Sequence, residues 1–195
     1  PRTHEFSILS VHEGLGMESS RENWKESVRA YFELFYKNHE REVSYTIKTW
    51  NNSKSEFDKF VFSLAQEKGY DGNYLPSVNI IDIDILEEDL NRLYSKSWVF
   101  LKNSYREGWS LPANEAVACG TPVISRALPS MPYLNEGNCG FFDTYDELKN
   151  QLQESWKRYR KFRFRVDEYS WKRSIAKLNE VLNAVLVQSK RVSVC

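Results

Sequence analysis

Long apolar runs are missing from this sequence of 195 residues, and its first residues contain no apolar segment like that of a signal peptide. A membrane-spanning helix needs about 20 consecutive apolar residues, so we expect no transmembrane segment. Cysteine is also scarce, because there are only three thiols, an odd number without metal-type spacing: Cys119, Cys139 and Cys195. These absences favour a soluble protein in the reducing cytoplasm.

An excess of charge of one sign is absent as well. Lysine plus arginine and aspartate plus glutamate number 27 each, which gives a formal net charge of zero. Because no overall field attracts polyanions, nucleic acid and anionic membranes are not expected partners.

The motifs of several common chemistries are also missing. The three histidines are scattered, and no His-x-x-x-His or Cys-x-x-Cys pair indicates a metal site, so we expect neither a metal nor a bound cofactor. Gly14-x-Gly16 lacks the third glycine of a dinucleotide fingerprint, and Ser104 and Ser110 lack a Gly-x-Ser-x-Gly frame. His12 follows an apolar run and would lie at the ligand edge of a parallel sheet, where it is either a site residue or a structural one.

What the sequence does contain is enough apolar material for a large core, with 41% apolar and 14% aromatic residues. Strand-like runs alternate with amphipathic helical patterns, which is typical of a parallel sheet covered by helices. The expected strands are Phe6 to Val11, Val43 to Ile47, Val78 to Ile83, Trp98 to Leu101 and Thr121 to Ser125. We therefore predict an α/β fold, a Rossmann-like parallel sheet with helices on both faces.

Helix starts are predicted from capping sequences between these strands. They are Ser19-x-x-Glu22, Ser55-x-x-Asp58, whose helix would end at Gly69, and Asp84-x-x-Glu87. The first helix has an apolar face formed by Trp24, Val28, Tyr31, Phe32 and Phe35, and the third has one formed by Leu86, Leu90, Leu93 and Tyr94.

The pattern loosens after Ser125, up to Phe141-Phe142. Asp143 is then expected to cap a helix from about Asp146 to Arg158, and the spacing of Ile175 to Leu186 predicts a closing helix. The chain is thus predicted to be one domain over residues 1–195, with a core at 6–145 and C-terminal helices at 146–190.

The segment from Tyr105 to Val123 has the character of a site. It reads Tyr-Arg-Glu-Gly-Trp-Ser-Leu-Pro-Ala-Asn-Glu-Ala-Val-Ala-Cys-Gly-Thr-Pro-Val and contains two carboxylates, Glu107 and Glu115. Ser110 and Pro112 suit the N-cap and first turn of a helix from Ala113 to Cys119. A helix start attracts anions such as phosphate, and carboxylates accept hydrogen bonds from sugar hydroxyls.

This segment resembles the donor-site signature of the retaining GT-B glycosyltransferases, family 4. The resemblance implies that Glu107 is the catalytic residue beside the transferred sugar and that Glu115 binds the ribose of the nucleotide. It also places Gly108, Trp109, Ser110 and Leu111 in the donor site. Tyr169-Ser170-Trp171 is similar to the opening of the closing helix in the same family.

The resemblance covers only the donor-binding C-terminal lobe of a GT-B enzyme. It implies a nucleotide diphosphate sugar as substrate, and a glycan or lipid-linked acceptor that an N-terminal lobe would bind. Without that lobe we expect this piece to have little or no activity of its own.

The sequence departs from the family pattern on the phosphate side. The alignment places Glu13 and Glu22 where the family has cations that neutralise the donor diphosphate. Arg21 and Lys25 are the nearest replacements, and Arg106 is another, although it would equally suit a salt bridge to a neighbouring carboxylate. Two functions therefore stay open, the donor lobe of a glycosyltransferase and a noncatalytic domain that recognises a sugar or nucleotide.

Overall fold

A computed structural model of the chain describes residues 6–15, 21–37, 43–50 and 54–158. Six strands form one sheet in the order β3-β2-β1-β4-β5-β6, and every neighbouring pair is parallel. The strands are β1 (Phe6–Val11), β2 (Val43–Lys48), β3 (Ser77–Ile81), β4 (Val99–Lys102), β5 (Val123–Arg126) and β6 (Cys139–Phe142). This order, in which the chain changes direction across the sheet between β1 and β4, is Rossmann-like and confirms the predicted fold class.

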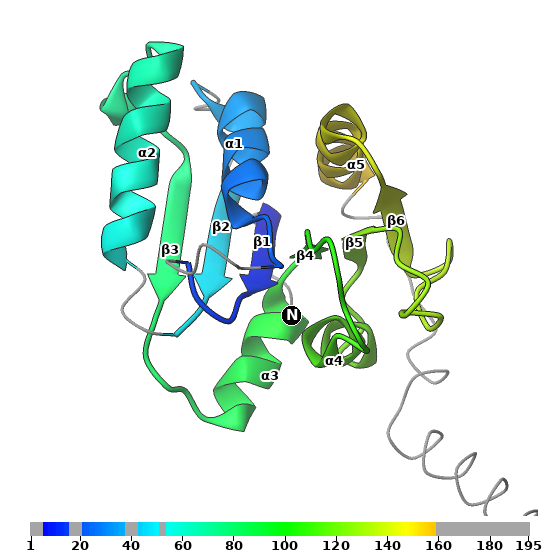
Figure 1. The fold of residues 1–195 in the computed structure, drawn as a ribbon. Coiled ribbons are helices and arrows are strands. Elements are labelled where there is room, and N and C mark those ends of the chain that lie inside the picture. Colours follow the sequence, from blue (N-terminus) through cyan, green and yellow to red (C-terminus); the bar gives the residue numbers. More distant parts are fainter. Residues whose placement is uncertain (1–5, 16–20, 38–42, 51–53, 159–195) are drawn as a thin grey trace, which may run out of the picture.

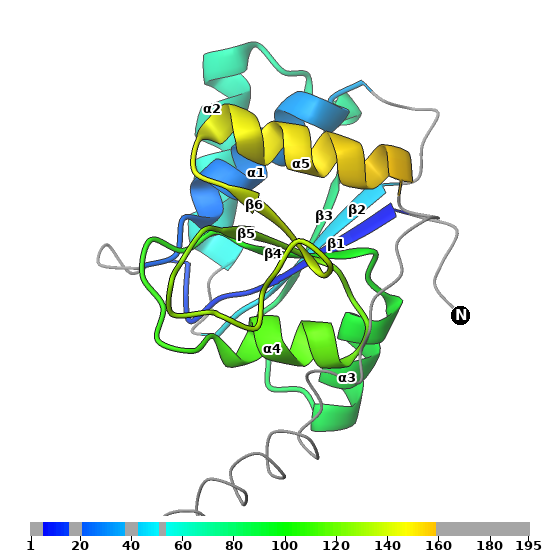
Figure 2. The ribbon, with the colours of Figure 1, turned by 90° about the vertical axis from the view of Figure 1, so that its right-hand side faces the viewer.

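Helices cover both faces of the sheet (Figures 1 and 2). One face carries α1 (Trp24–Phe35), α2 (Lys54–Lys68) and α5 (Tyr145–Arg158), and the other carries α3 (Glu87–Lys96) and α4 (Leu111–Ala118). A short 3-10 helix, η1 (Gly72–Tyr74), precedes β3. None of the helices within the described ranges is both long and apolar enough to cross a membrane.

Two apolar clusters follow from this layering, one on each face. Alternate residues of β1 point to opposite clusters, with Ile8 packing toward α1 and Leu9 toward α4. The predicted apolar face of α1 is confirmed, because all five of its side chains are buried. A buried parallel sheet of this kind leaves only the ends of its strands for polar chemistry.

Several predicted boundaries were wrong. The segment ending at Phe141-Phe142 forms the sixth strand, α4 begins at Leu111 instead of Ala113, and the third strand ends at Ile81. Thr144, not Asp143, caps α5, because the Thr144 Oγ1 accepts a 3.3 Å hydrogen bond from the Glu147 amide. The Glu147 carboxylate accepts one of 3.0 Å from the Thr144 amide in return, which completes a capping box.

The three predicted capping sequences also fail. Helix α2 begins at Lys54, so Ser55 lies inside the helix and does not cap it. The N-cap of α3 is Leu86, which makes no side-chain cap and is 72% exposed, so neither Asp84 nor the Leu86 part of the apolar face has its predicted role. Helix α1 begins at Trp24, after Glu22, and the Glu22 side chain turns to other partners. Ser19, the segment Tyr169-Ser170-Trp171 and the predicted closing helix lie outside the described residues.

Candidate functional site

A cleft of about 670 Å³ opens where β1, β2 and β4 end. Because β1 lies between β2 and β4, this is the point at which the strand order reverses, the usual ligand position in such sheets. The residues lining the cleft come from the segments after these strands, from the start of α1 and from the start of α4: Val11, His12, Glu13, Arg21, Glu22, Trp50, Lys102, Glu107, Gly108, Trp109, Ser110, Leu111 and Pro112.

The loop before α4 supplies one wall of the cleft. Glu107 and all four residues from Gly108 to Leu111 line it, so the structure brings together this part of the predicted donor site. The Tyr133 hydroxyl braces the loop, because its single proton is shared between the carbonyl oxygens of Trp109 (2.6 Å) and Ser110 (2.9 Å). Within the first turn of α4, the Ala113 and Asn114 amides donate to the Ser110 carbonyl oxygen at 3.1 Å and Pro112 has no amide proton, so the amide of the cleft-lining Leu111 is the group left for an anion.

Ser110 differs from its predicted role. It occupies the N-cap position of α4, but its side chain makes no capping hydrogen bond. Its backbone has φ 52° and ψ 76°, in the left-handed region that residues other than glycine seldom adopt. Such backbone conformations recur at ligand sites, where the surrounding structure holds them in place.

Glu107 lies at the base of this wall with two cations beside it. Its side chain is only 3% exposed, and its Oε1 is 2.8 Å from the Lys102 Nζ and 3.7 Å from the Arg21 Nε. Lys102 is the last residue of β4 and is equally buried, whereas the Arg21 side chain is 48% exposed at the rim. The Glu107 carboxylate is thus paired with two cations of the protein, and the same side chain also lines the cleft.

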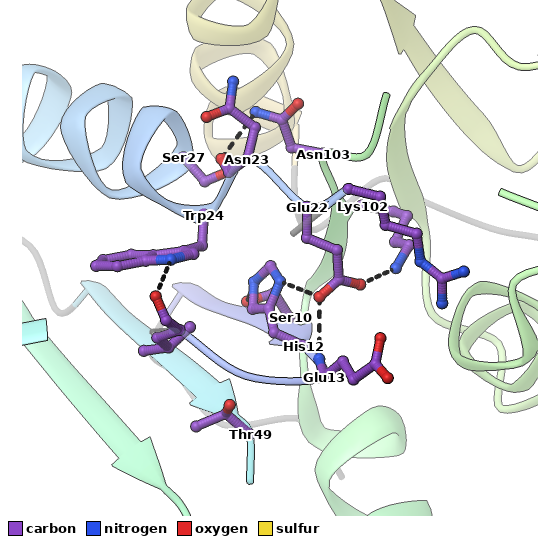
Figure 3. A network of polar contacts seen from close by, with 12 residues as sticks. Ser10, His12, Glu13, Glu22, Asn23, Trp24, Ser27, Thr49, Lys102 and Asn103 are labelled. Carbon is purple, nitrogen blue, oxygen red and sulfur yellow. Dashed lines mark hydrogen bonds and ion pairs between the residues drawn. The ribbon is translucent and has the colours of Figure 1, made fainter. Parts of the chain in front are cut away.

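A second buried carboxylate, Glu22, lies on the other side of Lys102 (Figure 3). Its Oε2 is 3.0 Å from the His12 Nδ1 and accepts a 3.0 Å hydrogen bond from the Glu13 amide, while its Oε1 pairs with the Lys102 Nζ. Burial alone would raise the pKa of this carboxyl, but the hydrogen bond from His12 together with the charge and hydrogen bond of Lys102 outweigh it and lower the pKa to about 2.

His12 is held from its other side by a hydrogen-bond chain. Its Nε2 is 2.9 Å from the Ser10 Oγ, which in turn accepts a 3.0 Å hydrogen bond from the Tyr45 hydroxyl. With Tyr45 donating, the Ser10 hydroxyl can donate to Nε2, which leaves the imidazole proton on Nδ1, toward Glu22. His12 therefore lines the cleft as part of a buried polar network.

The remaining predicted residues do not share one place. Arg21 lines the cleft, but Lys25 is exposed, extends over the Trp24 ring at 5.7 Å and is not a lining residue. Glu115 also lies outside the described lining, where its Oε2 accepts a hydrogen bond from the Tyr94 hydroxyl. Arg106 is exposed and does not line the cleft.

Two lining residues were not predicted, Lys102 and Trp50. Lys102 directly follows the apolar run that ends at Leu101, and a buried charge at the carboxyl end of a parallel strand was the signal that could have identified it. Trp50 follows β2 and is 39% exposed, which leaves part of its ring open to the cleft, and no local pattern in the sequence indicates this position.

Comparison with known proteins gives a sequence match and a wider structural likeness. The family model for glycosyl transferases group 1 matches residues 64–169. Over 46 residues, the chain is 41% identical to the O-antigen chain mannosyltransferase B of Escherichia coli, a stretch that covers 24% of this chain and 12% of that protein.

Solved structures share the fold at low sequence identity. The pneumococcal O-GlcNAc transferase GtfA, in complex with UDP and GlcNAc, superposes with a TM-score of 0.64 at 18% identity, over 95% of this chain and 36% of that one. An alpha,alpha-trehalose-phosphate synthase (UDP-forming) from Burkholderia vietnamiensis superposes with a TM-score of 0.58 at 14% identity, over 78% of this chain and 37% of that one. The catalytic domain of cholesterol-alpha-glucosyltransferase from Helicobacter pylori superposes with a TM-score of 0.57 at 14% identity, over 84% of this chain and 94% of that one. This chain therefore spans little more than a third of the first two proteins.

Proposed function

Because this chain belongs to the glycosyl transferases group 1 family, we propose that it is the donor-binding lobe of a retaining GT-B glycosyltransferase. The donor is a nucleotide diphosphate sugar, and the sugar passes to a glycan or lipid-linked acceptor. We propose that the acceptor is bound by a separate lobe and that residues 1–195 form one donor domain with little activity alone. This division is supported by the small share of the mannosyltransferase (12%) and of the O-GlcNAc transferase (36%) that the chain covers.

The observation that carries the proposal is the position of Glu107 in the cleft beside the start of α4. Its carboxylate can accept hydrogen bonds from sugar hydroxyls, while the Leu111 amide and the positive end of the α4 dipole can bind the phosphates that leave with the nucleotide. Arg21 at the rim adds a positive charge near the same place. Donors fixed in advance around the departing diphosphate stabilise its developing charge, and this mechanism requires no metal ion.

A noncatalytic domain that recognises a sugar or nucleotide is the second candidate, and the charge of the cleft favours it. Three carboxylates line the cleft, those of Glu13, Glu22 and Glu107, against the cations Lys102 and Arg21. With His12 neutral, the charges give a net of −1, which opposes a diphosphate. The two candidates therefore differ in whether the diphosphate contributes to binding.

Calorimetry on the chain distinguishes them, with UDP-glucose, UDP-GlcNAc, GDP-mannose, ADP-glucose and dTDP-glucose, and with the parent nucleotides, in the presence and absence of Mg²⁺. We expect at least one sugar nucleotide to bind without metal. Glu107→Gln should weaken binding of that sugar nucleotide by about tenfold, which corresponds to the loss of a charged hydrogen bond. Binding of the plain nucleotide should not change. Glu136→Gln removes an exposed carboxylate outside the cleft lining and serves as the control. Absence of heat with every donor would remove the donor-lobe proposal.

A further inference from the structure

We propose that Lys102 is a positioning residue, which fixes the Glu107 carboxylate for the sugar of the donor and is itself held by Glu22 and His12. This inference deepens the proposed function and rests on it. Its subject, Lys102, belongs neither to the family signature nor to the cation pattern of the diphosphate site.

The contacts form one continuous buried chain from the sheet to the cleft, and Figure 3 shows its middle part from Ser10 to Lys102. It runs from the Tyr45 hydroxyl through Ser10, His12 and Glu22 to the Lys102 ammonium, and then to Glu107. The first five residues are all buried, at 7% exposure or less. Hydrogen bonds connect the members from Tyr45 to Lys102, and the last link, from Lys102 to the Glu107 Oε1, is an ion pair of 2.8 Å. Such a network holds its members in one geometry, because any departure leaves a buried polar group or charge unpaired.

Lys102 is poorly placed to act instead as a phosphate ligand. Its side chain is 3% exposed, and its Nζ already contacts two carboxylates, Glu22 and Glu107, which together carry twice its charge. A phosphate that approached Lys102 would therefore meet a group with a net charge of −1. Repulsion from the two carboxylates therefore outweighs the attraction of the single ammonium.

Glu107 gains both charge balance and orientation from the same contact. Lys102 and Arg21 both approach Oε1, so the geometry assigns Oε2 to the ligand. Arg21 is half-exposed and 3.7 Å away, which makes the buried lysine the stronger restraint. Removing Lys102 would leave the Glu107 carboxylate free to rotate or to draw in water.

Glu22 in turn prevents Lys102 from turning away. Without it, one carboxylate would have to hold a buried ammonium alone, and a buried charge needs more than one partner to offset its desolvation. His12 and the Glu13 amide direct Glu22 from behind through its Oε2. The Glu22 carboxylate therefore serves the lysine and does not point an unpaired negative charge into the cleft.

A double-mutant cycle tests the proposal. The variants are Lys102→Met, Glu107→Gln and their combination, each titrated with UDP-glucose and UDP, or with GDP-mannose and GDP if that pair binds. Lys102→Met should weaken binding of the sugar nucleotide by about tenfold, because the extra affinity that the sugar confers is lost. Its affinity for the plain nucleotide should be unchanged. The combination should lose no more than Glu107→Gln alone, because the lysine acts through Glu107. Lys102→Arg should restore part of the loss.

Lys48→Met is the matched control. Lys48 is also a buried lysine at the end of a strand of the same sheet, β2, but its ammonium donates to the Thr49 carbonyl oxygen at 2.7 Å and lies 4.1 Å from the Trp50 ring centre. Its loss should show no coupling to Glu107→Gln. A crystal structure of Lys102→Met provides a measurement without ligand, in which we expect the Glu107 carboxylate to leave its present position.

The outcomes separate this inference from the proposed function. If Glu107→Gln removes the sugar-dependent affinity but Lys102→Met does not, the function stands and the inference is wrong. The inference is also wrong if Lys102→Met weakens the plain nucleotide as much as the sugar nucleotide, or if its crystal structure shows Glu107 unmoved. If no donor binds the unaltered chain, the proposed function fails, and the crystal structure still decides whether Lys102 positions Glu107.

Discussion

The Tyr94 hydroxyl donates a 3.0 Å hydrogen bond to the Oε2 of Glu115, linking the end of α3 to the middle of α4. Burial raises the pKa of Tyr94, and the charge and hydrogen bond of Glu115 raise it further. Tyr94 therefore remains a donor through the neutral range. The second carboxylate of the signature is thus restrained by the protein, although it lies outside the cleft that contains Glu107.

Substitution of Glu115 tests its predicted contact with the ribose. Glu115→Gln should weaken binding of the plain nucleotide and of the sugar nucleotide equally, by about 1 to 3 kcal/mol of binding free energy, because both ligands contain the ribose. Folding should be little affected, since the Tyr94 hydroxyl can donate to the new amide oxygen. Calorimetry with both ligands measures the change, and Tyr94→Phe is the control because it leaves the carboxylate in place. A loss confined to the sugar nucleotide would assign Glu115 to the sugar instead.

The structure distinguishes the two cations that the sequence left as alternatives. Arg21 lines the cleft and Lys25 does not, so Arg21→Ala should reduce affinity for a nucleoside diphosphate far more than for the nucleoside. The loss should shrink as salt concentration rises, because the side chain is half-exposed. Lys25→Ala should have little effect. Titrations at about 0.05 and 0.5 M salt measure both, and equal losses for the two variants would contradict the assignment.

The sheet and most helices were predictable because burial on both faces leaves a local signal. Each central strand is an apolar run, and α1 repeats its apolar side chains at helical spacing from Trp24 to Phe35. The sixth strand was missed because it has four residues, one of them Gly140, and follows a segment rich in turn residues. Its pairing with β5, which sequence patterns do not show, establishes it as a strand.

The site was predictable only where its residues are consecutive. The wall from Glu107 to Leu111 could be identified because one motif contains it. Glu22 was interpreted as part of a helix cap because local spacing fits one, but its partner Lys102 is 80 residues away in the sequence. A long-range ion pair of this kind leaves no spacing pattern, so the sequence could show that a cation was replaced by Glu22 but not what that carboxylate does.

That partnership reverses the expected effect of restoring the family cation. Glu22→Lys would place two buried ammonium groups together and remove the partner of His12, so we expect a loss of about 3 to 5 kcal/mol in the free energy of unfolding. Glu13→Arg, at an exposed neighbouring position, should change stability by less than about 0.5 kcal/mol. Chemical denaturation measures both. The charge-swapped pair Glu22→Lys with Lys102→Glu should recover part of the loss, and failure to recover any would argue against a direct interaction between the two.

Stability in acid provides an independent test of the network. The pKa of Glu22 is lowered from 4.5 to about 2, so the folded protein holds the charged form more tightly than the unfolded chain does. The resulting stabilisation, of the order of 3 kcal/mol, is present in full above about pH 5 and is lost as the pH falls through 4.5 toward 2. Glu22→Gln has no carboxyl at this position, so the unaltered protein should exceed it in stability by a margin that narrows over this range. Urea unfolding of both proteins at intervals between pH 6 and pH 2.5 measures the margin, and the other carboxyl groups cancel because both proteins contain them. A constant margin would mean that the charge on Glu22 is not what His12 and Lys102 stabilise, and Lys102 would then lack the anchor through which it is proposed to position Glu107.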